Sequence, residues 1–243
     1  MTEHIISVLP FFKALLIIPI VTFITTYTIS AFDKTQSYPY YFLSSSIDTK
    51  PSSSVGTFGI ALTSMLIPII STIRYEYVKH HITDSNNPNK NTIYKINKKG
   101  LKSSIISSVG ALGVASFQDG IDKCGGTFNT HIIHLLFSVV FFSGGLFYGH
   151  CTYKLDTLLP CLGTSFTRFV RKCLWYCSII QIILQPLNIG LFMSDTSDAF
   201  IFYMSILEIV LCVTIIAFYS TFYGEMKQLK LKIVLENSDF YSL

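Results

Sequence analysis

Charged residues are scarce in this sequence. Aspartate, glutamate, lysine and arginine together make up 13% of the 243 residues, whereas 50% of the residues are hydrophobic and the mean hydropathy is +0.51. A soluble domain with so little charge could not cover its surface with polar groups. The composition therefore excludes a soluble globular protein and indicates a polytopic integral membrane protein.

Motifs for catalysis and for metal binding are also missing. The chain has no nucleophile motif, no phosphate-binding glycine loop and no pair of carboxylates on one helix face. Its six cysteines lack the spacing of a zinc site, and only Cys124 lies in an outer segment, so no structural disulfide is expected. We therefore expect no enzymatic activity, no cofactor, no metal and no nucleic-acid partner.

Long apolar runs account for most of the chain. A helix needs about 20 apolar residues to cross a hydrocarbon core about 30 Å thick, and none of the runs alternates as a barrel strand does. Five runs reach that length: 8–32, 55–73, 130–149, 174–193 and 199–222. A sixth candidate, 103–118, would cover only about 24 Å and is diluted by serine and glycine.

The distribution of basic residues favours the sixth span. With six spans and both termini in the cytoplasm, the inner segments hold fourteen lysines and arginines, and the outer segments hold only Lys34, Lys50 and Lys123. Without the sixth span, eight basic residues would lie inside and nine outside, which breaks the rule that cytoplasmic loops collect them. The sequence therefore predicts an all-α bundle of six transmembrane helices, with both termini cytoplasmic, as a single domain over residues 1–243.

Glu208 is the least expected residue of these runs, because it is the only acidic side chain between residues 199 and 222. A charged carboxylate at the centre of a bilayer costs about 2.5–3.5 kcal/mol, so it should be paired or protonated. Counted from the outer ends of the predicted helices, other polar residues lie in the same outer half of the bundle as Glu208. They are Gln185, Asn188, His131, His134 and Gln118. Two interpretations of this polar cluster are open: a ligand pocket or proton relay, and hydrogen bonds that only join helices.

Small residues predict where helices approach each other closely. Gly145 and Gly149 have GxxxG spacing, and Ser107, Gly110 and Gly113 lie on one face of the 103–118 span. Such faces let helix backbones touch in lipid. We expect both faces in the interior of the bundle, with homodimerisation through the fourth span as the alternative.

The inner segment 74–102 is strongly basic, with seven basic and two acidic residues. Each lysine near an anionic leaflet contributes about 1 kcal/mol of attraction, which makes anionic lipids or a cytosolic protein candidate partners. The candidate lipid contacts are Lys95, Lys98, Lys99 and Lys102. The positive-inside rule by itself would explain the same charges.

Four stretches carry a resemblance to a known family. They are "YPYYFLSSSIDTKPSSSVGTFG", "IRYEYV", "GVASFQ" and "IAFYSTFYGEMKQLKLKI". In them the chain resembles the DRAM (damage-regulated autophagy modulator) and transmembrane protein 150 family, within the wider Frag1/DRAM/Sfk1-like group of six-span proteins. The resemblance places Glu208 at a family position, but Lys50 stands where the family has glycine, and no glutamate precedes the second span.

The resemblance also implies a function. It implies a non-enzymatic protein of lysosomal or endosomal membranes that modulates autophagy and has membrane lipids as partners. Two other functions are open: an organiser of phosphoinositide signalling or lipid asymmetry in the plasma membrane, and a factor for GPI-type lipid remodelling or transport. The expected compartment follows from the resemblance, because the sequence holds no acidic dileucine signal and no N-glycosylation site.

Overall fold

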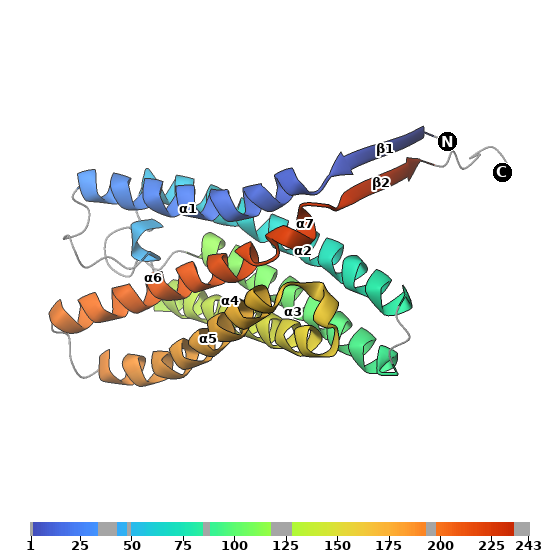
Figure 1. Cartoon of the computed structure of the whole chain (residues 1–243). Helices are drawn as coiled ribbons and strands as arrows, with labels where there is room; N and C mark the ends of the chain where they lie inside the picture. Colours follow the sequence, from blue (N-terminus) through green and yellow to red (C-terminus); the bar gives the residue numbers. More distant parts are fainter. Residues whose placement is uncertain are drawn as a thin grey trace, which may run out of the picture.

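The computed structural model of the chain describes residues 2–33, 43–47, 50–84, 88–117, 128–192 and 198–235. Within these residues six long helices lie side by side (Figure 1). They are α1 (Leu9–Phe32), α2 (Ser52–Asp84), α3 (Lys90–Ser116), α4 (Phe128–Leu158), α5 (Ser165–Phe192) and α6 (Asp198–Ser220). Each helix contacts the next one along the chain, and α6 also contacts α1, so the contacts close into a ring.

Four of these helices contain a segment that is long and apolar enough to cross a membrane. In the described part of the chain these segments are Leu9–Phe32, Ser52–Thr83, Ile132–Leu158 and Ser205–Met226. Large hydrophobic side chains such as Ile24, Met65 and Val139 are exposed on the outside of the bundle, where lipid would surround them. The bundle is therefore that of an all-α integral membrane protein, whereas the six-span count and the cytoplasmic side of the termini stay predictions.

The small residues of α3 pack directly against α4. A Cβ atom on Gly110 would lie 2.3 Å from the backbone nitrogen of Phe141, and one on Gly144 would lie 2.8 Å from the backbone nitrogen of Ser107. The Ser107 hydroxyl donates a hydrogen bond of 2.8 Å to the Phe141 carbonyl. The serine and glycine that dilute the hydropathy of α3 thus form its contact surface, which confirms that this face lies in the interior of the bundle.

The GxxxG glycines of α4 also contact other helices of the same chain. Gly149 is buried, and a Cβ atom there would lie 3.3 Å from the Trp175 ring of α5 and 3.9 Å from the Phe218 ring of α6. Gly145 lies beside Ser107, at an ordinary contact distance of 3.6 Å. The spacing therefore serves packing within the bundle, and homodimerisation through this helix stays a prediction.

Most of the basic inner segment is helical in the described residues, because α2 and α3 extend beyond the predicted spans. The second span was expected to end at residue 73, but α2 continues to Asp84, and the third was expected to begin at 103, but α3 begins at Lys90. Hydropathy marks where a helix leaves the lipid, whereas lysine and glutamate are themselves good helix formers. The extensions are held together by a hydrophobic core at this end of the bundle, which consists of Val78, Ile82, Ile93, Leu155, Leu159 and Leu162.

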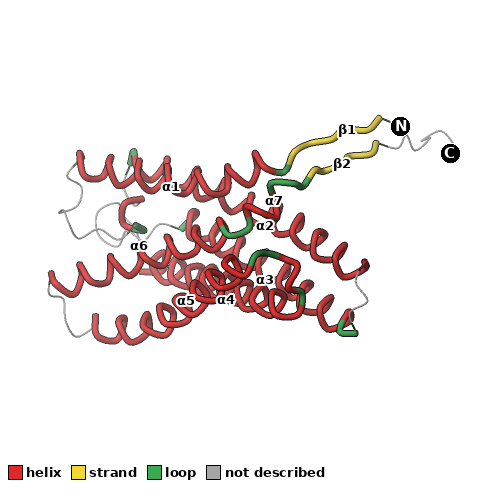
Figure 2. The backbone as a smooth tube through the Cα atoms, in the orientation of Figure 1, coloured by secondary structure: helices red, strands yellow, loops and turns green. Residues whose placement is uncertain are grey.

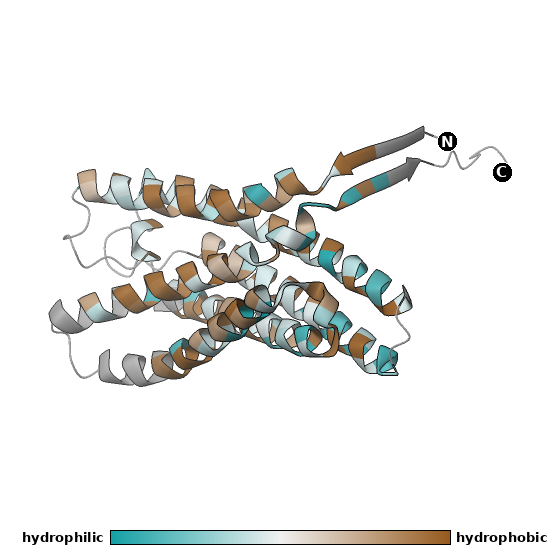
Figure 3. Cartoon of the chain, viewed as in Figure 1, coloured by the Kyte–Doolittle hydropathy of each residue, from teal (hydrophilic) through white to brown (hydrophobic). Residues whose placement is uncertain are grey.

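The two ends of the chain pair with each other. Strand β1 (Thr2–Ser7) and strand β2 (Lys230–Leu235) form an antiparallel ribbon in the register Thr2↔Leu235 to Ser7↔Lys230, and Figure 2 shows it extending beyond the helices. This ribbon is an addition to the predicted all-α bundle. In Figure 3 the hydrophilic residues of α2 and α3 gather at the same end of the bundle as the ribbon.

Candidate functional site

The Glu208 carboxylate binds the backbone of the loop between α1 and α2. Its Oε2 accepts a hydrogen bond of 2.5 Å from the Leu43 N–H, and its Oε1 accepts one of 3.3 Å from the Ser44 N–H. These residues precede the short 3-10 helix η1 (Ser45–Ile47). A half-buried carboxylate is thus paired with peptide N–H groups, which are donors that carry no charge of their own.

Residues 43–47, here called the 43–47 segment, are also attached to α1. The Ser30 hydroxyl donates 2.9 Å to the Ser46 carbonyl, and the Thr26 and Ser46 hydroxyls lie 3.1 Å apart. The segment therefore lies between α1 and α6, as the arc of η1 between these helices shows in Figure 1. Side chains of both helices hold it there.

A cavity of about 110 Å³, here called the bundle chamber, lies beneath the 43–47 segment. It is lined mainly by aliphatic and aromatic side chains, including Pro19 of α1, Ile67 of α2, Phe141 of α4 and Ile216 of α6. Glu208 and His134 also line it. The chamber is therefore an apolar space with a carboxylate and an imidazole in its wall.

His134 is buried and its ring orientation is fixed. It is 4% exposed, and its Nδ1 lies 2.6 Å from the Phe117 carbonyl oxygen. A carbonyl can only accept, so Nδ1 carries the proton, and in the neutral ring Nε2 is an acceptor. Of the predicted polar cluster the structure thus brings Glu208 and His134 to one cavity. Gln118 and the side chains of His131, Gln185 and Asn188 lie outside the described residues.

Glu208→Gln should loosen the 43–47 segment. A glutamine offers one acceptor oxygen instead of two and no charge, and hydrogen bonds to charged groups contribute about 1.5–3 kcal/mol. We expect amide hydrogen exchange in residues 43–47 to become at least about tenfold faster in micelles, measured by mass spectrometry. Glu76→Gln, which alters an exposed glutamate of α2, is the control, and equal protection in both variants would contradict this role of the carboxylate.

A second polar group, here called the inner ion cluster, lies at the opposite end of the bundle. It consists of Arg74 of α2, Asp156 of α4, Arg171 of α5 and Glu225 of the short helix α7 (Tyr223–Met226). Arg74 Nε lies 3.0 Å from Glu225, Arg171 Nη1 lies 2.9 Å from Asp156, and Arg171 Nη2 also pairs with Glu225. All four residues are at most 7% exposed. Two cations therefore balance two anions away from solvent.

One aromatic ring completes the inner ion cluster. The guanidinium carbons of Arg74 and Arg171 lie 4.2 Å and 4.6 Å from the centre of the Phe222 ring, where cation–π attraction stabilises them. The cluster was not predicted from the sequence, where both arginines count only as charges that orient the chain. A signal existed, since "IRYEYV" contains Arg74 and "FYGEMK" contains Glu225. These stretches carried the family resemblance.

The four candidate lipid-contacting lysines form one helix face. Lys95, Lys98, Lys99 and Lys102 all belong to α3 and are exposed. Positions three, four and seven residues apart lie on one side of a helix. The charges are therefore presented as an ordered stripe, here called the lysine face, and not as a flexible loop.

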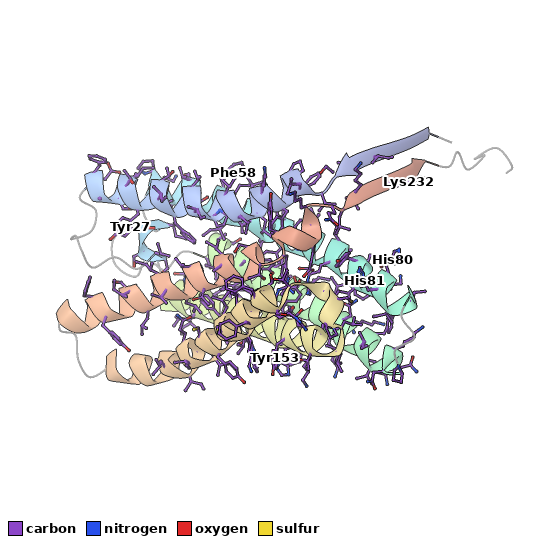
Figure 4. All side chains as sticks on the ribbon, in the orientation of Figure 1. Tyr27, Phe58, His80, His81, Tyr153 and Lys232 are labelled. Atoms are coloured by element: carbon purple, nitrogen blue, oxygen red, sulfur yellow. The ribbon has the colours of Figure 1, made fainter. Side chains whose placement is uncertain are left out.

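The described residues contain no group of three metal-ligating side chains. His80 and His81 lie side by side near the end of α2, as labelled in Figure 4, with ring centres 6.2 Å apart. The Tyr153 ring, also labelled there, stacks on Trp175 at 5.0 Å. The contact of Tyr153 with Trp175 joins α4 to α5, whereas the two histidines contact each other within α2.

Apolar helices arranged around an interior carboxylate, with basic residues gathered at the end that carries both termini, define a multi-pass helical membrane protein. Residues 7–229 match the family described as the Frag1/DRAM/Sfk1/Cwh43P N-terminal domain, and the chain belongs to this family. The match supports the wider group to which the four stretches pointed, and the narrower likeness to DRAM and transmembrane protein 150 stays a resemblance. Neither a curated protein nor a solved structure matches the chain significantly.

Proposed function

We propose that the protein is a non-enzymatic, six-span membrane protein that modulates autophagy from a lysosomal or endosomal membrane. Membership in a family whose description includes DRAM supports the process. The side-by-side arrangement of six long helices supports the six spans. The gathering of both chain ends and the hydrophilic helix ends at one end of the bundle supports cytoplasmic termini.

The observation that carries the proposal is the bond between Glu208 and the 43–47 segment over the bundle chamber. This carboxylate either holds a lipid headgroup or responds to the pH of the lumen. In the second case protonation weakens its acceptance of the Leu43 and Ser44 N–H groups, so the segment loosens in acid and closes near neutrality. The other titratable groups that line the same chamber are His134 of α4 and Cys212 and Tyr219 of α6.

Autophagic flux in cells depleted of the protein tests this proposal. The readout is turnover of the lipidated autophagosome marker, with and without inhibition of lysosomal acidification. We expect reduced flux, restored by the wild type and by Glu76→Gln but not by Glu208→Gln. Rescue by a Glu208→Gln protein that localises normally would refute the role of the carboxylate, and unchanged flux after depletion, under starvation and under genotoxic stress, would refute the autophagy function.

The lysine face favours a second candidate function, the organisation of phosphoinositides or other anionic lipids at the plasma membrane. Four like charges on one side of α3, close to the point where the helix leaves the apolar core, are placed to meet headgroups of the inner leaflet. A cytosolic protein with an acidic surface would meet the same face.

Removal of the lysine face should weaken binding to anionic lipid. The variant changes Lys95, Lys98, Lys99 and Lys102 to alanine, and we expect at least about tenfold weaker capture of phosphoinositide vesicles, because each lysine contributes about 1 kcal/mol. The control removes the same charge at dispersed positions, Lys79, Lys90, Lys172 and Lys227. Equal losses in the two variants would mean that net charge alone attracts the lipid, and an unchanged autophagic flux in the first variant would separate the two functions.

A further inference from the structure

The bundle chamber has an apolar lining and room for the first few carbons of a hydrocarbon chain. Its volume is about 110 Å³, and an apolar cavity of about 150 Å³ in a soluble protein stays dry and takes up a benzene-sized molecule. Side chains from α1, α2, α3, α4 and α6 surround it. Water gains too few hydrogen bonds in such a space to fill it stably, so an aliphatic chain is the better occupant.

The polar groups of the chamber select the headgroup. The Glu208 carboxylate only accepts hydrogen bonds, and a neutral imidazole at His134 presents Nε2 as an acceptor because its Nδ1–H is donated to the Phe117 carbonyl. The hydroxyls of Thr63, Ser138 and Tyr219 also line the chamber and can donate or accept. The carboxylate and the imidazole nitrogen favour a ligand that donates, such as an ammonium or a hydroxyl group. A carboxylate or phosphate monoester would meet repulsion from Glu208 in a region of low dielectric constant.

The 43–47 segment marks the route of entry. Helices α1 and α6 contact each other sparsely, and the segment lies between them, with Leu43, Ser44 and Ile47 contributing to the chamber wall. Both helices expose hydrophobic side chains to the surroundings, such as Ile24 of α1 and Val210 of α6. A ligand dissolved in the bilayer therefore reaches the chamber between α1 and α6, with the segment as its cover.

We propose that the bundle chamber binds the head of a single-chain lipid, and that this head is a hydrogen-bond donor without negative charge. The head lies at Glu208 and His134, the first few carbons lie among the apolar side chains of the chamber, and the rest of the chain leaves between α1 and α6 into the bilayer. This inference rests on the proposed function in that it assigns a ligand class to the same carboxylate. It is decided by binding, whereas autophagic flux decides the proposed function.

Photo-crosslinking on the purified full chain in lipid nanodiscs tests the inference. The probes are octadecylamine, octadecanol and octadecanoate, each with a diazirine within the first few carbons next to the head, and the crosslinked residues are located by mass spectrometry. We expect octadecylamine and octadecanol to label chamber residues such as Phe141 and Ile216, and octadecanoate to label them at least tenfold less. The net charge of the protein, +4, would by itself attract octadecanoate more strongly than octadecylamine.

Two matched pairs of variants make the result specific. Ile216→Trp fills the chamber, and Val213→Trp places the same ring on the exposed face of α6, where Val213 is 58% exposed. The first should lose the chamber crosslinks and the second should keep them, while Glu208→Gln should remove the discrimination against octadecanoate and Glu76→Gln should retain it.

Several results would overturn the inference. They are equal labelling by all three probes, labelling confined to lipid-facing residues, and unchanged labelling in a folded Ile216→Trp protein. Chamber labelling with the expected preference, together with normal flux in depleted cells, would leave the ligand site standing and remove the autophagy function.

Discussion

Arg171→Met should lower the free energy of unfolding by about 3–5 kcal/mol, because it removes the cation that pairs with the buried Asp156 carboxylate and one of the two cations that pair with Glu225. The Arg171 guanidinium bonds Asp156 and Glu225, and its Nε and Nη2 also donate to the hydroxyl and the carbonyl of Thr221 at 2.9 Å and 3.1 Å. The substitution removes all of these bonds from a residue that is 1% exposed. Reversible denaturation in mixed micelles measures the change, and in cells the steady-state amount of protein should fall.

Two variants test whether the loss comes from unbalanced charge. Lys172→Ala changes the neighbouring, exposed residue of α5 and should alter stability by no more than about 0.5 kcal/mol. Arg171→Met combined with Asp156→Leu removes one cation and one anion and leaves Arg74 paired with Glu225. We expect this double variant to be more stable than Arg171→Met alone, since apolar pairs can replace buried ion pairs at little cost. A further loss of stability in the double variant would show that packing by Asp156, and not charge balance, holds the helices together.

Gly110→Ala should destabilise the bundle by about 1–3 kcal/mol, although alanine favours a helix more than glycine does. The new Cβ would lie 2.3 Å from the Phe141 nitrogen and 2.9 Å from the Phe137 carbonyl oxygen. Both are backbone atoms, so no side chain can rotate away, and α3 and α4 must separate. That separation also stretches the hydrogen bond from Ser107 to Phe141. Thermal denaturation in micelles should show a lower midpoint.

Gly224→Ala provides the matched control for this packing effect. Gly224 lies in α7 and is exposed, and a Cβ atom there would meet nothing within 4 Å. The substitution should therefore leave stability unchanged or raise it by up to about 1 kcal/mol through the unfolded state. A tolerated Gly110→Ala, with a midpoint like that of Gly224→Ala, would mean that the contact between α3 and α4 can open freely.

Local properties of the sequence were sufficient to predict the class of fold. Runs of apolar residues have to be helical in lipid because the backbone can satisfy its hydrogen bonds within each helix. Glycine and serine at helical spacing predicted a packing face before the partner helix was known, and α4 proved to be that partner. The sequence also marked Glu208 as unusual, since one carboxylate in an apolar run needs a specific partner.

The helix ends were predicted less well, and the reason is physical. A hydropathy scale detects the lipid boundary, so it ended the second span at residue 73 and could not detect that α2 continues to Asp84. The continuation depends on Val78 and Ile82 packing against residues of α3 and α4. Such packing depends on neighbouring helices and leaves only a weak local pattern.

By itself, the sequence determined that this chain forms a helical membrane protein, which of its faces pack closely and which acidic residue stands alone in an apolar run. Only the tertiary structure decided what that residue contacts, because the Leu43 and Ser44 N–H groups lie more than a hundred positions from Glu208. The same holds for the pairing of Arg74 with Glu225, and for the joining of the two chain ends in a ribbon. Composition and spacing predict whether a segment faces lipid or packs against another helix. Contacts between residues distant in sequence form only when the helices come together.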